Sequence, residues 1–146
     1  MSGSAYLPQL RAAVGSRVLI MPAVSVLPGD GEGRILLRQH DGFGAWGLIG
    51  GTLHLDESPW DGVRRKAAEV GIEVDGLSLV DVYGGPEYRI TYPNGDELAI
   101  VGSVFAAALA GPLSDSVQWF TTDNLAAIPL VGLTRAILRG QRLITE

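Results

Sequence analysis

The hydrophobic and polar positions of the chain predict a helix near its middle, between residues 59 and 70. The apolar positions there recur at spacings of three and four, which places them on one face of an α-helix. They are Trp60, Val63, Ala67 and Val70. Ser58 is a typical N-cap, Pro59 suits the first helical position, and Gly71 is suited to end the helix. The pattern therefore predicts a helix of about three turns whose apolar face packs on a core.

The other face of this helix is charged. Arg65, Lys66 and Glu69 fall there, and we expect them to point away from the core. Arg65 and Glu69 are four positions apart and Lys66 and Glu69 three apart, spacings at which opposite charges stabilise a helix. Lys66 is the only lysine in the chain.

Apolar, β-rich runs on both sides of the helix predict strands. The expected strands span residues 17–27, 34–38, 77–83, 87–92, 97–109 and 117–120. We expect the first two to form a central hairpin across a Pro-Gly-Asp-Gly-Glu-Gly turn, and the first is apolar enough to be buried on both faces. The pair Asn94–Gly95 predicts another hairpin, between 87–92 and 97–109.

Two further helices are predicted near the ends of the sequence, over residues 5–14 and 131–139, with a glycine after each. We expect the first to cap the domain or a dimer partner. Residues 39–46 are interpreted as a glycine-punctuated loop, and the glycines that follow in 47–72 as a loop that runs into the helix. The order of elements predicts the α+β class, and 146 residues with 47% hydrophobic content suit a single domain over 1–146.

Composition narrows the range of functions. A net charge of -5 argues against binding nucleic acid or a membrane surface, because both require a basic face. The chain has no cysteine and no apolar run long enough to span a bilayer. We therefore expect a soluble, cytoplasmic protein whose partner is a small molecule, and an anionic ligand would be met by local positive charges.

The helix and the glycines before it resemble the Nudix signature G-x5-E-x7-R-E-U-x-E-E-x-G-U, in which U is aliphatic. Gly51, Glu57 and Arg65 fall on its first glycine, first glutamate and arginine. The residues from Trp46 to Gly51, including Gly50, are similar to the usual W-G-L-P-G-G with isoleucine in place of proline. The resemblance implies an α/β/α sandwich with a mixed central sheet. It also implies hydrolysis of nucleoside diphosphate-linked compounds with divalent cations.

The chain departs from this signature within the helix. Gly51 and Gly71 are 20 positions apart where the family has 21, so two alignments are open. Counted from Gly51, Lys66 replaces the first helix glutamate; counted back from Gly71, Arg65 does. Glu69 is the one helix glutamate kept in both. Glu57 and Glu69 could hold a single Mg²⁺ or Mn²⁺ weakly, and a site without metal is the alternative.

Lys66 offers one such alternative, because its ammonium could bind an anionic substrate where the family places a metal ligand, although a solvated helix face is the plainer interpretation. His54 and Asp56 lie two apart on an extended segment and could form a rebuilt metal site or an acid–base pair with Glu57 or Glu69. A surface loop is the plainer interpretation of that pair. The candidate catalytic residues are Glu57, Glu69, Arg65, Lys66, His54 and Asp56.

Substrate contacts are expected from the glycines and from aromatic side chains that could line a pocket for a flat ligand. The candidates are Trp46, Gly50, Gly51, Tyr83, Tyr88 and Trp119. Aromatic residues on strands also serve sheet packing, which is the alternative. His40 and Asp115 are weaker candidates for histidine chemistry and for a late catalytic base.

Three functions follow. The first is a divergent Nudix hydrolase with a weakened metal site. The second is a Nudix fold repurposed for metal-independent acid–base chemistry on a small molecule, for example in a biosynthetic pathway. The third is a ligand-binding or regulatory protein without catalysis. A homodimer is expected from the family resemblance.

Overall fold

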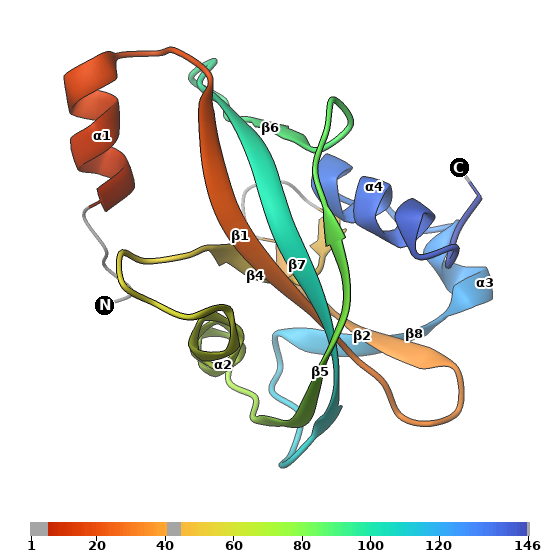
Figure 1. Cartoon of the computed structure of the whole chain (residues 1–146). Helices are drawn as coiled ribbons and strands as arrows, with labels where there is room; N and C mark the ends of the chain where they lie inside the picture. Colours follow the sequence, from red (N-terminus) through yellow and green to blue (C-terminus); the bar gives the residue numbers. More distant parts are fainter. Residues whose placement is uncertain (1–5, 41–44, 146) are drawn as a thin grey trace.

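The computed structural model describes residues 6–40 and 45–145. It contains a larger and a smaller sheet (Figure 1). The larger sheet consists of β1 (Leu19–Pro28), β4 (Ile49–Thr52), β5 (Val74–Tyr83), β6 (Arg89–Thr91) and β7 (Glu97–Leu109). The smaller sheet consists of β2 (Arg34–His40), β3 (Ala45–Gly47) and β8 (Val117–Thr121). The larger sheet is mixed, because β1 runs parallel to β7 while β4, β5 and β6 pair antiparallel.

Helices flank the long strands on both sides. They are α1 (Tyr6–Val14), α2 (Pro59–Glu69), α3 (Thr122–Leu125) and α4 (Gly132–Gly140). Figure 1 shows α2 and α4 on opposite sides of β1, β7 and β5. The predicted α+β class and the α/β/α arrangement with a mixed sheet are confirmed. None of the helices in the described ranges is long and apolar enough to cross a membrane.

Alternate residues of β1 serve two separate cores. Met21 and Ala23 pack in a cluster with Ile137 of α4, whereas Val24 and Val26 pack in a cluster with Val63 of α2. This alternation follows from the two-residue period of a strand. The prediction that β1 is buried on both faces is correct for its central residues.

The predicted helix is present as α2, and its caps are those expected from the sequence. The Ser58 hydroxyl accepts a hydrogen bond of 3.1 Å from the backbone N–H of Asp61, and Gly71 has a φ of +79°. Val63 and Ala67 are buried, but Trp60 is 44% exposed, and its ring makes an edge contact with Phe105 of the core. The apolar face is therefore narrower than predicted.

The predicted central hairpin is wrong. β1 and β2 belong to different sheets, and an isolated bridge between Gly29 and Ile35 lies at the turn that joins them. A fully buried strand needs partners on both edges, and β1 finds them in β4 and β7, which lie far along the chain. The glycine-rich turn therefore carries the chain from one sheet to the other.

The segments interpreted as loops contain the end of β2 and the strands β3 and β4. Their glycines allow close approach of backbones. A methyl group at Gly50 would lie 2.2 Å from the Val24 carbonyl oxygen. The second predicted hairpin is confirmed, since β6 pairs with β7 across Asn94–Gly95.

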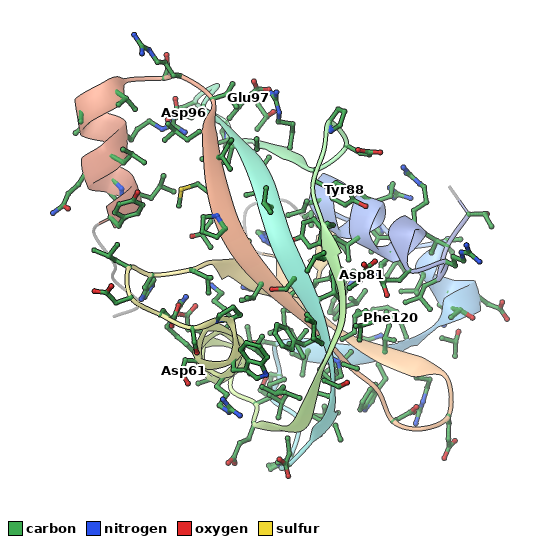
Figure 2. The ribbon with its side chains drawn as sticks, viewed as in Figure 1. Asp61, Asp81, Tyr88, Asp96, Glu97 and Phe120 are labelled. Atoms are coloured by element: carbon green, nitrogen blue, oxygen red, sulfur yellow. The ribbon has the colours of Figure 1, made fainter. Side chains whose placement is uncertain are left out.

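The N-terminal helix α1 has no buried residue and is attached to this hairpin by Arg11. The Arg11 guanidinium lies 3.4 Å from the Asp96 carboxylate and donates a hydrogen bond to the Glu97 carbonyl oxygen. Figure 2 shows Asp96 and Glu97 together at this turn. The Arg11 contacts therefore hold the helix against the β6–β7 hairpin, and its role as a cap of the domain or of a dimer partner stays a prediction.

Candidate functional site

Four charged residues of α2 and the loop before it form a connected group, here called the charged cluster: Glu57, Arg65, Lys66 and Glu69. The Arg65 guanidinium is at its centre. It donates to both oxygens of Glu57 at 2.7 and 2.9 Å, to Glu69 at 3.0 Å and to the Thr52 carbonyl oxygen at 3.1 Å. Lys66 Nζ donates to the other oxygen of Glu69 at 2.8 Å. Arg65, Lys66 and Glu69 lie outside the hydrophobic core and form the ion pairs that their spacing predicts.

The cluster keeps its carboxylates ionised. Hydrogen bonding from Arg65 lowers the pKa of Glu57 to about 2 against the cost of burial, and the backbone N–H of His54 adds a further bond. Burial acts to raise the pKa of Glu69, but Lys66 and Arg65 together bring it below its usual value. The hydrogen bond to Glu57 raises the pKa of Arg65 against the opposing effect of burial. Two anions and two cations are therefore matched within the cluster.

This donor set does not fit a cluster of divalent cations. Within residues 6–40 and 45–145, no group of three or more carboxylate, histidine or cysteine side chains converges as metal ligands would. Both oxygens of Glu57 and of Glu69 already accept hydrogen bonds from cationic side chains. Mg²⁺ requires oxygen ligands that are free to coordinate it. We therefore derive no chemical step through a metal.

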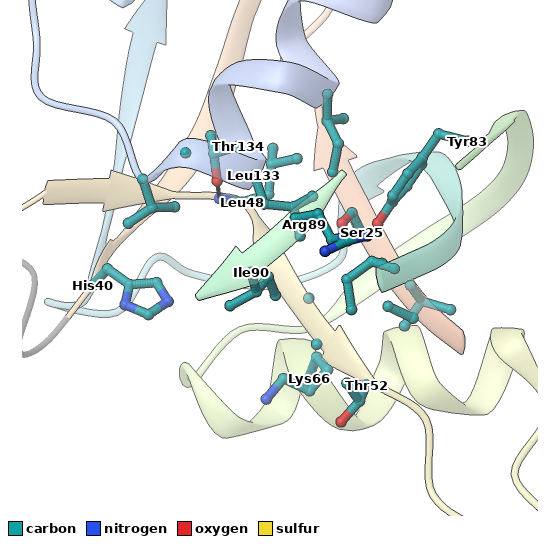
Figure 3. A pocket seen from close by; sticks show the side chains of 18 of the residues that line it. Ser25, His40, Leu48, Thr52, Lys66, Tyr83, Arg89, Ile90, Leu133 and Thr134 are labelled. Atoms are coloured by element: carbon teal, nitrogen blue, oxygen red, sulfur yellow. Dashed lines mark hydrogen bonds between the residues drawn. The ribbon is translucent and has the colours of Figure 1, made fainter. Parts of the chain in front are cut away.

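A pocket of about 460 Å³ lies beside the cluster, between β4, β6 and α4 (Figure 3). Most of its lining is apolar and includes Leu48, Ile90, Ile100, Val131, Leu133 and Ile137. Its polar and charged side chains are Ser25, His40, Thr52, Lys66, Tyr83, Arg89, Thr91, Tyr92 and Thr134. No aspartate or glutamate belongs to the lining within the described part of the chain. The lining thus carries basic side chains and no acidic one in a protein of net charge -5, although Lys66 and Arg89 each pair with a carboxylate outside it.

Lys66 reaches this pocket over Gly51. β4 is the end strand of the larger sheet, and a methyl group at Gly51 would lie 2.9 Å from Lys66 Cε and 3.1 Å from Nζ. The absence of a side chain at Gly51 therefore leaves room for the lysine stem to pass the sheet edge. The same ammonium belongs to both the charged cluster and the pocket lining.

Tyr83 contributes a buried hydroxyl to the pocket. Burial raises its pKa to about 12, and the nearby Ser25 side chain offsets part of this rise. The hydroxyl makes no hydrogen bond to another group among the described residues. The Tyr83 ring lies over Gly102, where a methyl group would meet the hydroxyl oxygen. Tyr83 therefore stays neutral at physiological pH and can serve as a hydrogen-bonding group, not as a charge.

The predicted substrate contacts separate into two sets. Gly50, Gly51 and Tyr83 line the pocket. Three aromatic residues lie outside its lining: Trp46 packs edge-on against Phe120, Tyr88 lies against Tyr83, and Trp119 lies beneath the Arg34 guanidinium. These last three contacts are the packing alternative that the sequence left open.

Among the predicted catalytic residues, the structure joins Glu57, Arg65, Lys66 and Glu69 and leaves the other two apart. His54 contributes its backbone N–H to Glu57, and Asp56 is exposed with a φ of +65°. Asp115 is exposed and lies outside the pocket lining, whereas His40 belongs to it.

The sequence interpretation missed the contribution of α4 and β6. Leu133, Thr134 and Ile137 line the pocket from α4, and Arg89 and Ile90 line it from β6. The three- and four-residue spacing of the α4 residues was visible, but it indicates a buried helix face without saying what that face contacts.

The mixed sheet, its glycine-rich end strand and the capped helix that follows define a Nudix-type fold. The NUDIX domain model matches residues 19–139, and the chain belongs to this family. A MutT-like protein of Streptomyces ambofaciens is 32% identical over 102 residues, which are 65% of this chain and 60% of that protein. The chain thus matches less than two thirds of that relative's length.

Two solved structures extend the likeness. The MutT NUDIX hydrolase of Burkholderia pseudomallei is 26% identical, with a TM-score of 0.65 over 82% of this chain and 96% of that one. The NUDIX domain of Shewanella oneidensis NrtR, solved with ADP ribose, is 21% identical, with a TM-score of 0.60 over 97% of each chain. At that identity the second likeness concerns the fold alone.

Proposed function

We propose that this Nudix-family protein binds a small anionic molecule in the pocket between β4, β6 and α4, with the Lys66 ammonium as its charge contact and without a divalent metal. One observation carries the proposal: the pocket lining contains Lys66 and Arg89 but no acidic side chain in the described residues. A lysine ammonium is a compact point charge suited to phosphate or carboxylate.

The charged cluster makes Lys66 available to such a ligand. Glu69 is held by Arg65 as well as by Lys66, so an incoming anion can replace Glu69 at the ammonium while Arg65 keeps the carboxylate in place. Glu69 is the single carboxylate bonded to Lys66 in the described residues, and it lies outside the pocket lining. The exchange therefore leaves no carboxylate without a cationic partner.

Binding in the presence of EDTA tests this proposal. The panel is ADP-ribose, nucleotide sugars, nucleoside triphosphates and organic carboxylates, measured by calorimetry with the wild type, Lys66→Met and Glu69→Gln. We expect at least one anion to bind in EDTA, to lose about tenfold or more affinity in Lys66→Met, and to keep its affinity in Glu69→Gln. Binding that needs Mg²⁺ and is lost in Glu69→Gln would contradict the proposal.

Metal-dependent hydrolysis of a nucleoside diphosphate-linked compound is the second candidate. It is favoured by the family and by Glu57 and Glu69, which contact the same guanidinium and so lie close together. It requires both carboxylates to leave Arg65 and Lys66. Product release from the same panel with Mg²⁺, Mn²⁺ or EDTA separates the candidates, because metal-dependent turnover abolished by Glu69→Gln supports only this one.

Turnover in EDTA would extend the first proposal to metal-independent acid–base chemistry. Binding without any turnover would make the protein a ligand-binding or regulatory member of the family. A cytoplasmic location and a homodimer remain predictions. Cell fractionation and light scattering after size-exclusion chromatography would check them.

A further inference from the structure

We infer that the ligand of this pocket is a small organic anion with a single charged group and a mainly hydrocarbon body, and not a nucleotide. The inference rests on the proposed function and specifies its substrate class. It concerns the surface that the body of the ligand contacts and the number of charges that the pocket can match.

The body of the ligand would contact hydrocarbon on several sides. Ile90 comes from β6, Ile100 from β7, and Leu133 and Ile137 from α4. Ile90 and Leu133 are only partly buried and offer the accessible apolar surface. Ile100 and Ile137 are 1% and 2% exposed and belong to the core cluster behind it. A volume of about 460 Å³ falls within the range of pockets that enclose small organic ligands. Burying a hydrocarbon body there removes apolar surface from water on both sides of the contact.

The charge of the pocket suits one anionic group. Arg65 lies outside the lining and is fully engaged by Glu57, Glu69 and Thr52. Arg89 lines the pocket, but its side chain is 46% exposed and lies 3.4 Å from the Glu97 carboxylate. Lys66, with 19% of its side chain exposed, is the better desolvated cation and therefore the stronger contact. A diphosphate, which carries two or more charges, would be undermatched.

The lining contains two tyrosines, Tyr83 and Tyr92, of which Tyr92 is 36% exposed and Tyr83 provides no stacking surface. Its ring lies against Tyr88, with centroids 4.7 Å apart, and is 9% exposed. A nucleobase commonly binds by stacking on an exposed aromatic face. The Tyr83 hydroxyl and Ser25 offer hydrogen bonds to a neutral oxygen of the ligand, and Figure 3 shows this hydroxyl well apart from Lys66.

A matched series of eight-carbon probes tests the inference. Octanoate, 1-octanol and octylammonium share one hydrocarbon body and differ in charge, and ADP-ribose serves as the nucleotide probe. All are titrated by calorimetry into the full chain in EDTA. We expect octanoate to bind at least tenfold more tightly than octanol and ADP-ribose, and octylammonium to bind more weakly than octanol.

Variants test separately the contact of Lys66 with the charged group of the ligand and the contact of the apolar lining with its hydrocarbon body. Lys66→Met should reduce the affinity for octanoate to that for octanol and leave octanol unchanged. Leu133→Ser should weaken octanoate and octanol by the same factor, about five or more, because it removes apolar lining without touching the charge. Ile90→Ser repeats this test from β6. Leu113→Ser is the control, since Leu113 is a 45% exposed leucine outside the pocket lining.

The outcomes separate this inference from the proposed function. ADP-ribose could instead bind more tightly than octanoate and lose its affinity in Lys66→Met. That result would contradict the inference that the ligand has a hydrocarbon body, and it would support the proposed contact between Lys66 and an anion. Octanoate and octanol binding equally, both unaffected by Lys66→Met, would overturn the inference, and the proposed function would fall only if no anion of its own panel lost affinity in Lys66→Met. Absence of octanoate binding to the wild type, or equal binding by Leu133→Ser and Leu113→Ser, would overturn the inference.

Discussion

The charged cluster and the pocket share Lys66 but differ in how their charges are balanced. In the cluster, the carboxylates of Glu57 and Glu69 are matched by Arg65 and Lys66 within a few ångströms. In the pocket, Lys66 and Arg89 face a lining without any carboxylate in the described residues. Both members of each cluster pair thus lie within the cluster, whereas the pocket lining contains only the cationic members of its pairs, because the partners Glu69 and Glu97 lie outside it.

The comparison separates two parts of the Nudix signature: the Glu57–Arg65 contact, which this chain keeps, and the helix residues after Arg65, which differ from the signature. The cluster retains the first glutamate and the arginine, and together they fix the loop before α2 to the helix. Lys66, which falls on the first helix glutamate when the signature is counted from Gly51, extends over Gly51 towards the pocket. Substitutions that affect one region and spare the other would sharpen this comparison.

The largest effect is expected at Gly50, which supports both regions. A methyl group there would lie 2.2 Å from the Val24 carbonyl oxygen and 2.9 Å from Ser25 Cα, so Gly50→Ala should lower the free energy of unfolding by about 3 kcal/mol. Gly51→Ala is the matched control, because the three atoms nearest its methyl group all belong to the flexible side chain of Lys66. It should keep stability and weaken anion binding. Urea unfolding of both variants measures this, and equal losses would contradict it.

The next effect concerns the cluster alone. Arg65→Met should destabilise the protein by about 2–3 kcal/mol at neutral pH, since it leaves the Glu57 carboxylate, 13% exposed, without its guanidinium. Arg64→Met is the control, because Arg64 is 58% exposed in a loose pair with Asp61 and should matter by less than about 0.5 kcal/mol. Equal free energies of unfolding for Arg65→Met and Arg64→Met would contradict this prediction, because they would show that the cluster contributes no more to stability than an exposed ion pair.

The third prediction concerns acid. The pKa of Glu57 is lowered to about 2 from an ordinary value of 4.5, so its contribution to stability is fully present above pH 4.5 and is lost as the pH falls towards 2. We expect this contribution to be about 2 kcal/mol, allowing for partial solvent screening. Glu57→Gln should show a flatter dependence of unfolding free energy on pH across that interval. Parallel curves for wild type and variant would show that Glu57 is not the group responsible.

The smallest effect is expected at the N-terminus of α2. Ser58→Ala removes the oxygen that accepts from Asp61 N–H and should cost about 1 kcal/mol, whereas Ser58→Gly should cost only a few tenths. Thermal unfolding followed by circular dichroism can resolve the two. Octanoate affinity should stay unchanged in both variants, because Ser58 lies outside the pocket lining. A loss of affinity would mean that the two regions are coupled through the helix.

The parts of the fold that were predictable from sequence depend on neighbours along the chain. Ser58, Pro59 and Gly71 bounded α2 because caps act within one helical turn, and Asn94–Gly95 identified the hairpin because its turn sets its own pairing. The pairing of β1 was not predictable in this way. Its neighbours β4 and β7 are separated from it by long stretches of chain, and hydrophobic pattern does not specify which buried strands pair.

The site shows the same division. The contact of Arg65 with Glu69 followed from a four-residue spacing, but the path of Lys66 depends on a missing side chain at Gly51, fifteen positions earlier. Helix spacing placed Lys66 on the solvent side, because spacing describes one helix and not the strand beside it. The pocket lining from α4 and β6 arises only when the whole sheet is assembled.

The position of the single lysine over Gly51 also gives the protein its own spectroscopic probe. Reductive methylation with ¹³C-formaldehyde would label one ε-amine besides the α-amine. The resulting side-chain signal would come from the boundary between the charged cluster and the pocket. The chemical shift of the methylated Lys66 amine would report the exchange of Glu69 for an added anion. This readout requires no change in the backbone.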